Sequence, residues 1–135
     1  MLEYCLADWT IARVAGSRGF TAAEQEFDRR SRLYASVFDR NTRFLRPRLR
    51  SGAWMTPFDP LATEGSGSWT GSGGPGFVEG NAWHYTWFVP HDVQGVVSLF
   101  GGTADCAAKL DSCFRMKHFT INNEPDIAYP YLFTY

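Results

Sequence analysis

Several features are scarce in this sequence, and each absence argues against a class of protein. No apolar run approaches the roughly 18 residues that a membrane-spanning helix needs, and no basic segment followed by an apolar one has the pattern of a signal peptide. The net charge is only −1 over 135 residues, so neither nucleic acid nor an anionic membrane is an expected partner. The three cysteines, Cys5, Cys106 and Cys113, are an odd number. They are therefore predicted to be small buried residues rather than a disulfide framework or a metal site.

Apolar and aromatic side chains are plentiful instead. Hydrophobic residues make up 44% of the chain and aromatic residues 16%, which is enough for a core and for a binding surface as well. Eight arginines lie between positions 29 and 50. Asp28 and Asp39 accompany them, so we interpret the cluster as a solvated helix face with one or two buried loop arginines rather than a nucleic-acid site.

Helical periodicity dominates the first part of the chain. Apolar residues recur at helical spacing over 2–15, and Gly16 and Gly19 mark the end of this predicted helix. Thr21 followed by Glu24 has the pattern of a capping box that begins a second helix. A short glycine-containing turn between two helices predicts an antiparallel helical hairpin.

Residues 39–78 have no sustained periodicity and contain several prolines and a Gly/Ser run. A loop of this length is rare in a compact domain unless it has a function. We predict that 39–60 is an ordered crossover, and that 63–76 is a candidate mobile segment. The residues expected to pin the crossover are aromatic: Phe44, Trp54, Phe58 and Trp69.

The last part of the chain returns to helical patterns. Short helices are predicted over 81–88 and from Pro90 to Phe100, and Gly101-Gly102 would stop the second of them. Thr103 would cap a further helix to about 114, and 128–135 has the pattern of another helix start. The fold class is therefore predicted to be mainly α, with helical hairpins and one long irregular loop at about 39–78. Because both ends lie inside apolar helical patterns, we expect 1–135 to be a fragment of one larger domain.

The densest cluster of candidate functional residues is EGNAWHYTWFVPHD, which runs from Glu79 to Asp92. A carboxylate precedes a row of aromatic side chains, and flat aromatic faces with a few polar groups are typical of sugar-binding sites. A carboxyl group beside aromatics can also serve as a general acid. An alternative is a buried helix start, because Trp83 and Trp87 are one turn apart. His84 is a candidate hydrogen-bond partner for a sugar.

A second candidate cluster is NNEPD at 122–126. Its side chains offer oxygen atoms, which hard cations such as calcium prefer. The spacing is not that of an EF-hand, and Asn-rich proline turns are also ordinary surface structure.

Five segments in the same order resemble glycoside hydrolase family 92, the calcium-dependent exo-acting α-mannosidases. The segment LEYCLADWTIARVA resembles the family's LEYAYDDW helix, and EGNAWHYTWFVPHD resembles a signature stretch of the family. The other three are DRNTRFLRPR at 39–48, which resembles D-x-x-T-G-F-M-R-P-R, FDP at 58–60, which resembles PFDP, and NEP at 123–125 with YPYLF at 129–133, which resembles NEP…PYLYNY.

The resemblance implies a partial (α/α)₆ toroid and an inverting exo-α-mannosidase that removes terminal α-mannose from glycans or mannans. It implies Glu79 as the general acid, sugar contacts from the aromatic segment (Trp83, His84 and Tyr85), and calcium near Asn123 and Glu124. It also implies a secreted, periplasmic or cell-surface enzyme. The family's base-bearing segment, G-N-D/E-D-x-G, is absent from these residues, so the chain alone is expected to be inactive.

One departure bears on the metal and the sugar contacts. Many family members follow NEP with a small residue and two histidines, whereas this chain continues with Asp126, Ile127 and Ala128. Two alternatives stay open at this point. One is another carbohydrate-active enzyme on an α/α toroid, which a Glu79 buried away from any cleft would favour. The other is a non-catalytic helical carbohydrate-binding module, which independent folding of the chain would favour.

Overall fold

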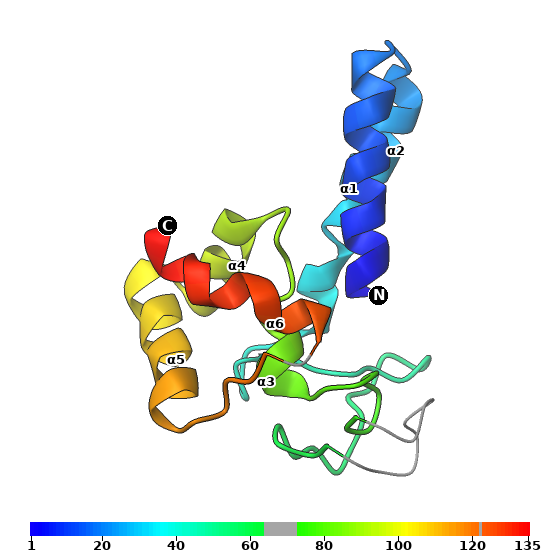
Figure 1. The fold of residues 1–135 in the computed structure, drawn as a ribbon. Coiled ribbons are helices and arrows are strands. Elements are labelled where there is room, and N and C mark those ends of the chain that lie inside the picture. Colours follow the sequence, from blue (N-terminus) through cyan, green and yellow to red (C-terminus); the bar gives the residue numbers. More distant parts are fainter. Residues whose placement is uncertain (64–72, 122) are drawn as a thin grey trace.

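The computed structural model of the chain describes residues 1–63, 73–121 and 123–135, and helices dominate these residues (Figure 1). The mainly α prediction is confirmed. The only β-pairing assigned to named strands within the described residues is one antiparallel pair of two-residue strands. In chain order the elements are α1 (Leu2–Ser17), α2 (Thr21–Ser31), η1 (Leu33–Val37), β1 (Phe38–Asp39), β2 (Phe44–Leu45), α3 (Ala82–Tyr85), α4 (Val93–Phe100), α5 (Thr103–Arg115), α6 (Glu124–Ala128) and η2 (Tyr129–Thr134).

Helices α1 and α2 form the predicted hairpin, and they project together from the rest of the chain (Figure 1). Small side chains such as Ala12 and Ala15 are buried on α1, which lets the two helices approach closely. The predicted capping box is wrong. Phe20 precedes α2 and makes no side-chain cap, and the Glu24 carboxylate instead lies beside Gly16. A Cβ atom on Gly16 would be 2.5 Å from Glu24 Oε1, so the glycine makes room for the carboxylate.

The crossover after α2 is ordered around a buried ion pair. Strands β1 and β2 pair in register, with Asp39 opposite Phe44. An Arg46 nitrogen lies 2.9 Å from the Asp39 carboxylate, and the two side chains are only 11% and 4% exposed. Arg46 also donates to the Met55 carbonyl at 2.8 Å. Burial raises the pKa of Asp39, but the hydrogen bonds from Arg46 and from the Asn41 amide outweigh burial and leave the pKa below its ordinary value.

Aromatic side chains fix this crossover, as predicted. Phe44 is buried and packs edge-on against Trp83 and Phe58, with ring centroids 4.9 and 6.0 Å away. Trp54 lies under the Arg48 guanidinium at 4.7 Å. Trp69 and most of the candidate mobile segment fall in 64–72, outside the described residues. At the end of that segment, Gly73 and its neighbour at position 74 are buried.

Helices α3, α4 and α5 begin and end close to their predicted positions, with three differences. Helix α3 is a single turn rather than the predicted eight residues. Helix α4 begins after Asp92, whose carboxylate accepts from the Gly95 amide at 2.9 Å, so Pro90 is not its start. Gly101 ends α4 in the left-handed region at φ 97°, as predicted, and Gly102 rather than Thr103 precedes α5.

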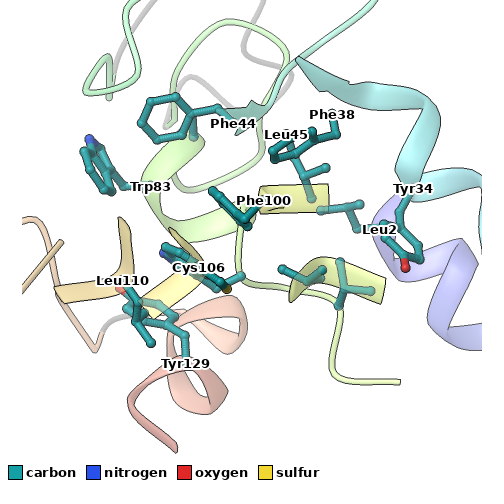
Figure 2. Close-up of a cluster of buried hydrophobic side chains, with 14 of the residues drawn as sticks. Leu2, Tyr34, Phe38, Phe44, Leu45, Trp83, Phe100, Cys106, Leu110 and Tyr129 are labelled. Atoms are coloured by element: carbon teal, nitrogen blue, oxygen red, sulfur yellow. The ribbon is translucent and has the colours of Figure 1, made fainter. Parts of the chain in front are cut away.

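One aromatic-rich core joins these elements (Figure 2). The Trp87 and Phe100 rings stack with centroids 5.4 Å apart, and Phe38 packs edge-on against Phe100. Leu45 ties the crossover to the turn after α3, because its amide donates to the buried Thr86 hydroxyl at 3.1 Å. The fully or nearly buried members of this core are Leu2, Cys5, Tyr34, Phe38, Phe44, Leu45, Ala82, Trp83, Trp87, Val89, Val96, Phe100, Cys106, Leu110, Cys113 and Tyr129. The three cysteines are buried free thiols, as predicted.

Apolar side chains also remain exposed at both ends of the chain. Tyr4 and Val14 on α1 are 74% and 58% exposed, and Ile127 and Tyr131 near the C-terminus are 60% and 68% exposed. Large contiguous apolar patches usually mark surfaces that another element covers. Among the described helices, none is both long enough and apolar enough to cross a membrane.

Candidate active site

Glu79 lies at the junction between the irregular loop and α3, and its side chain is exposed. Its backbone is left-handed, with φ 55°, which is unusual for a residue that has a Cβ atom. The backbone of residues 73–74 lies against the backbone of residues 79–80 and holds this conformation. The Gly74 amide donates to the Gly80 carbonyl at 2.8 Å, and a Cβ atom on Gly73 would lie 2.7 Å from the Glu79 amide nitrogen. Only glycine permits so close an approach of two backbones.

A capping box fixes the chain directly after Glu79. The Asn81 side-chain oxygen accepts from the Trp83 amide at 2.9 Å, and His84 Nδ1 accepts from the Asn81 amide at 3.3 Å. Since Nδ1 is the acceptor, we assign the proton to Nε2, which lies 3.3 Å from the Thr120 hydroxyl. Burial lowers the pKa of His84, although the Asp126 carboxylate opposes the shift. The imidazole is therefore a neutral structural link between α3 and the segment before α6.

Trp83 is also buried, at 5% exposure. Its ring packs against Phe44 and lies 4.9 Å from the His118 ring. The Lys109 ammonium sits over both aromatic rings, 3.7 Å from the Phe44 centroid and 4.2 Å from the Trp83 centroid. Burial, with a smaller contribution from the charge of Arg43, lowers the pKa of Lys109 to about 8.

Tyr85 is the member of the predicted sugar-contacting set that reaches an open surface. It lines a cavity of about 330 Å³, whereas the buried Trp83 and His84 do not. The Tyr85 hydroxyl donates to the Val78 carbonyl. Burial raises its pKa to about 12, and the carboxylates of Glu3, Glu79 and Glu124 add to the shift. Carboxylates on α1, in the loop and on α6 thus all act on the pKa of one tyrosine.

The cavity lies between the start of α1, the strand β2 and the loop before α3. Its walls are mainly apolar, and charged groups approach it from two sides: Glu3 from α1, and Arg46 and Arg48 from the crossover. Hydrogen bonds to backbone carbonyls already engage both guanidinium groups. The first residues of α1 are therefore part of the wall next to Tyr85, which the sequence did not indicate.

Asn123 and Glu124 lie beside the Glu79 loop. The sequence suggested a turn at 122–126, but α6 begins at Glu124, and Asn123 caps it by accepting from the Glu124 amide at 2.8 Å. The side-chain nitrogen of Asn123 donates to the Glu79 carbonyl at 3.1 Å, although the two residues are 44 positions apart. Two regions that the sequence separates, the predicted acid and the predicted calcium cluster, are therefore joined by one side chain.

The donor set around α6 fits part of a calcium site. The Glu124 carboxylate is exposed and has the hard oxygen atoms that calcium binds, usually about 6–8 in number. The Asn123 side-chain oxygen already accepts one backbone hydrogen bond, which leaves one lone pair. Within 1–63, 73–121 and 123–135, no group of three or more His, Cys, Asp or Glu side chains is placed to hold a metal. Further ligands would have to come from elsewhere.

The family model described as the glycosyl hydrolase family 92 catalytic domain matches residues 1–135. The chain belongs to glycosyl hydrolase family 92. Its described helices are part of the α/α toroid of that family.

Solved structures of family 92 enzymes are similar to the chain over most of its length. Two structures of the α-mannosidase BT3965 from Bacteroides thetaiotaomicron, one of them in complex with mannoimidazole, match with TM-scores of 0.82 and 0.84 and 31% and 32% identity. Each covers 99% of this chain. The inverting mannosidase BT2199 from the same organism matches with a TM-score of 0.71 and 34% identity over 82% of this chain.

The chain is short beside these relatives. It spans 19% and 17% of the two BT3965 chains and 14% of BT2199. A curated protein from Arthroderma benhamiae, named an uncharacterized secreted glycosidase, is 29% identical over 94 residues, which is 12% of its length. The family is therefore established for this chain, and the activity of a full-length enzyme is taken up below as a proposal.

Proposed function

We propose that these residues form part of the catalytic domain of a full-length, inverting exo-α-mannosidase that hydrolyses terminal α-mannose from glycans or mannans. One observation supports this most directly. Glu79 is an exposed carboxylate in a left-handed backbone conformation at a loop–helix junction, and the surrounding chain matches family 92 α-mannosidase structures over nearly its whole length. Unusual backbone conformations that the surroundings enforce tend to occur at active sites.

The chemistry assigned to this chain is that of the general acid. Glu79 would donate its proton to the glycosidic oxygen as the bond to the sugar breaks, which avoids an unstable alkoxide leaving group. Inversion requires a second carboxyl group about 6.5–9.5 Å away, with room for a water molecule between the two groups. We assign that base to residues of the full-length enzyme outside these 135, in keeping with the absent G-N-D/E-D-x-G segment.

The residues after Glu79 hold the acid and shape its surroundings. Tyr85 and the cavity it lines offer an aromatic and partly apolar wall near the loop. The buried Trp83 and His84 support this wall from behind, through packing on Phe44 and through the capping box. Direct contact of Trp83 or His84 with a sugar stays a prediction for the full-length enzyme.

We also propose calcium as a cofactor, held in part by Glu124 and by the remaining lone pair of the Asn123 side-chain oxygen. A bound calcium ion would supply positive charge and coordination for sugar hydroxyls. If so, exhaustive chelation of the full-length enzyme abolishes activity, and calcium restores it. Glu124→Ala would weaken calcium binding in a calorimetric titration, whereas Glu26→Ala on the distant α2 would not. Full activity after exhaustive chelation would contradict the calcium proposal.

The stereochemistry of the product tests the proposed function. The full-length enzyme is incubated with a methyl α-mannoside or an α-linked mannobiose, and the first product is followed by proton NMR. An inverting exo-α-mannosidase releases β-mannose first, and the signal of the α-anomer grows only as mutarotation proceeds. Release of α-mannose would contradict inversion, and the absence of hydrolysis with every α-mannoside tested would contradict the function itself.

The place of action is a further part of this proposal. The curated relative carries the name of a secreted glycosidase. We therefore propose that the full-length enzyme is secreted, periplasmic or displayed at the cell surface. Fractionation of cells that express it from its own gene would test this.

A further inference from the structure

We propose that Asn123 is a positioning residue for Glu79, and that its side-chain amide couples the direction of the acid to helix α6. The inference rests on the proposed role of Glu79 as the general acid. It concerns the donor end of the Asn123 amide, which is a different atom from the oxygen that a cation would bind.

The Asn123 amide is held at both ends. Its oxygen accepts from the Glu124 amide at 2.8 Å, and its nitrogen donates to the Glu79 carbonyl at 3.1 Å. The amide group is planar, so fixing its oxygen on the first turn of α6 also fixes the direction of its N–H bonds. The backbone oxygen of Asn123 accepts from the Asp126 amide at 3.0 Å, which ties the residue to the helix a second time. Asn123 is therefore a short rigid link from α6 to the acid loop.

The Glu79 backbone needs such a link. A left-handed conformation is unfavourable for a residue with a Cβ atom, and it persists only where the surroundings enforce it. Contacts from nearby in the sequence act on the residues around it: Gly73 abuts the Glu79 amide nitrogen, and the Gly74 amide binds the Gly80 carbonyl. The Glu79 carbonyl itself accepts a hydrogen bond from Asn123, a residue 44 positions away. The peptide plane after Glu79 is thus oriented by α6.

The orientation of this peptide matters for an acid. Proton donation requires the carboxyl oxygen to be within hydrogen-bond distance of the glycosidic oxygen. A displacement of about 1 Å can reduce the rate about 10²-fold. Loss of the Asn123 donor would leave the Glu79 carbonyl free to rotate, and the Cα–Cβ bond of Glu79 would turn with the peptide. The carboxyl group would still be present, but on average it would not point at the glycosidic oxygen.

Asn123→Asp separates this role from metal ligation. The new carboxylate keeps an oxygen to accept from the Glu124 amide, and Asp is as good as Asn at a helix N-cap. It also keeps or strengthens the affinity for a cation. The oxygen that replaces the amide nitrogen cannot donate, however, and it would face the Glu79 carbonyl with like partial charge. Asn123→Ser is the second variant, because serine also caps a helix but its hydroxyl is too short to bridge to Glu79.

The experiment uses the full-length enzyme with two substrates. One is an α-linked mannobiose, whose leaving group needs a proton, and the other is a dinitrophenyl α-mannoside, whose leaving group does not. Asn123→Asp and Asn123→Ser are measured beside Glu79→Gln, and Gln25→Glu on the exposed face of α2 is the matched amide-to-carboxylate control. Melting temperature and calorimetric calcium affinity are recorded for each variant.

We expect Asn123→Asp and Asn123→Ser to lower kcat on mannobiose by about 10- to 100-fold and to lower it far less on the dinitrophenyl mannoside. Calcium affinity of Asn123→Asp should not fall, the melting temperature should stay near that of the parent, and Gln25→Glu should behave like the parent. Equal losses on both substrates, or no loss, would overturn the positioning role. If Glu79→Gln shows the leaving-group effect and neither Asn123 variant does, only this inference fails. If Glu79→Gln keeps its activity on mannobiose, the acid assignment fails and this inference fails with it.

Discussion

The α1–α2 hairpin and the region around α3 are built from different interactions. The hairpin is closed by small side chains and by ion pairs that reach the surface, such as Arg13–Asp28 at 2.8 Å. The region around α3 is closed by aromatic rings, among them Phe44 and Trp83 (Figure 2). The buried Arg46–Asp39 pair also holds it together. Surface ion pairs contribute little to stability, whereas large buried aromatics contribute several times more.

This difference matches the tasks of the two regions. The hairpin projects from the rest of the chain and leaves Tyr4 and Val14 exposed, as expected of an element whose outer face another part of a larger domain covers (Figure 1). The region around α3 holds Glu79 in an unfavourable backbone conformation, which only well-ordered surroundings can maintain. Rigidity is therefore concentrated where the proposed acid lies.

Breaking the buried ion pair should have the largest effect on stability. Arg46→Met would leave the Asp39 carboxylate buried without its partner, which typically costs about 3–5 kcal/mol. Hydrogen exchange of the full-length enzyme should show a loss of protection over 38–55, with little change in α1 and α2. Because the pKa of Asp39 is depressed in the folded state, the contribution of the pair is present above the ordinary pKa of an aspartate and is lost as the pH falls below it. Unchanged protection over 38–55 would mean that the aromatic contacts hold the crossover alone.

Removing the cap of α3 should have an intermediate effect. Asn81→Ala takes away the acceptor of the Trp83 amide, and such a loss typically costs about 0.5–2 kcal/mol. We expect faster exchange of the amides in 82–86, and Asn81→Ser, which keeps a capping oxygen, should recover most of the protection. An alanine variant with parent-like exchange would show that packing of Trp83 suffices to hold this turn.

Breaking a surface ion pair of the hairpin should have the smallest effect. Glu26 and Arg29 form a pair one turn apart on α2, and their side chains are 51% and 64% exposed. Glu26→Gln should leave exchange in α1 and α2 unchanged within error, at low and at high salt. A clear loss of protection would contradict the proposed difference in how the α1–α2 hairpin and the region around α3 are stabilised.

The sequence predicted those features that depend on neighbours along the chain. The α1–α2 hairpin and the stop at Gly101 follow from helical periodicity and from the conformational freedom of glycine. The start of α6 was missed, although Asn123 before Glu124 and a proline is a helix-start signal, because the same residues were interpreted as an oxygen-rich turn.

The periodicity of the sequence could not predict features that depend on tertiary contacts. The capping partner of Asn81 is His84, which is not one of the usual Glu or Gln residues of a capping box. The left-handed Glu79 has no sequence signature of its own, because its conformation comes from packing against the nearby Gly73 and from a hydrogen bond with Asn123, 44 residues away. The burial of Trp83 and His84 likewise depends on contacts with the crossover and with α5, which the sequence does not show. Their aromatic character was therefore interpreted as a binding surface.

One kinetic comparison shows whether Glu79 acts as the general acid. Glu79→Gln in the full-length enzyme keeps the shape of the side chain and removes the transferable proton. If Glu79 is the general acid, kcat/KM falls about 10²- to 10⁴-fold on α-linked mannobiose and much less on a dinitrophenyl α-mannoside, and the melting temperature is unchanged. Equal losses on the two substrates, accompanied by a lower melting temperature, would contradict this role and leave Glu79 a structural residue of the loop.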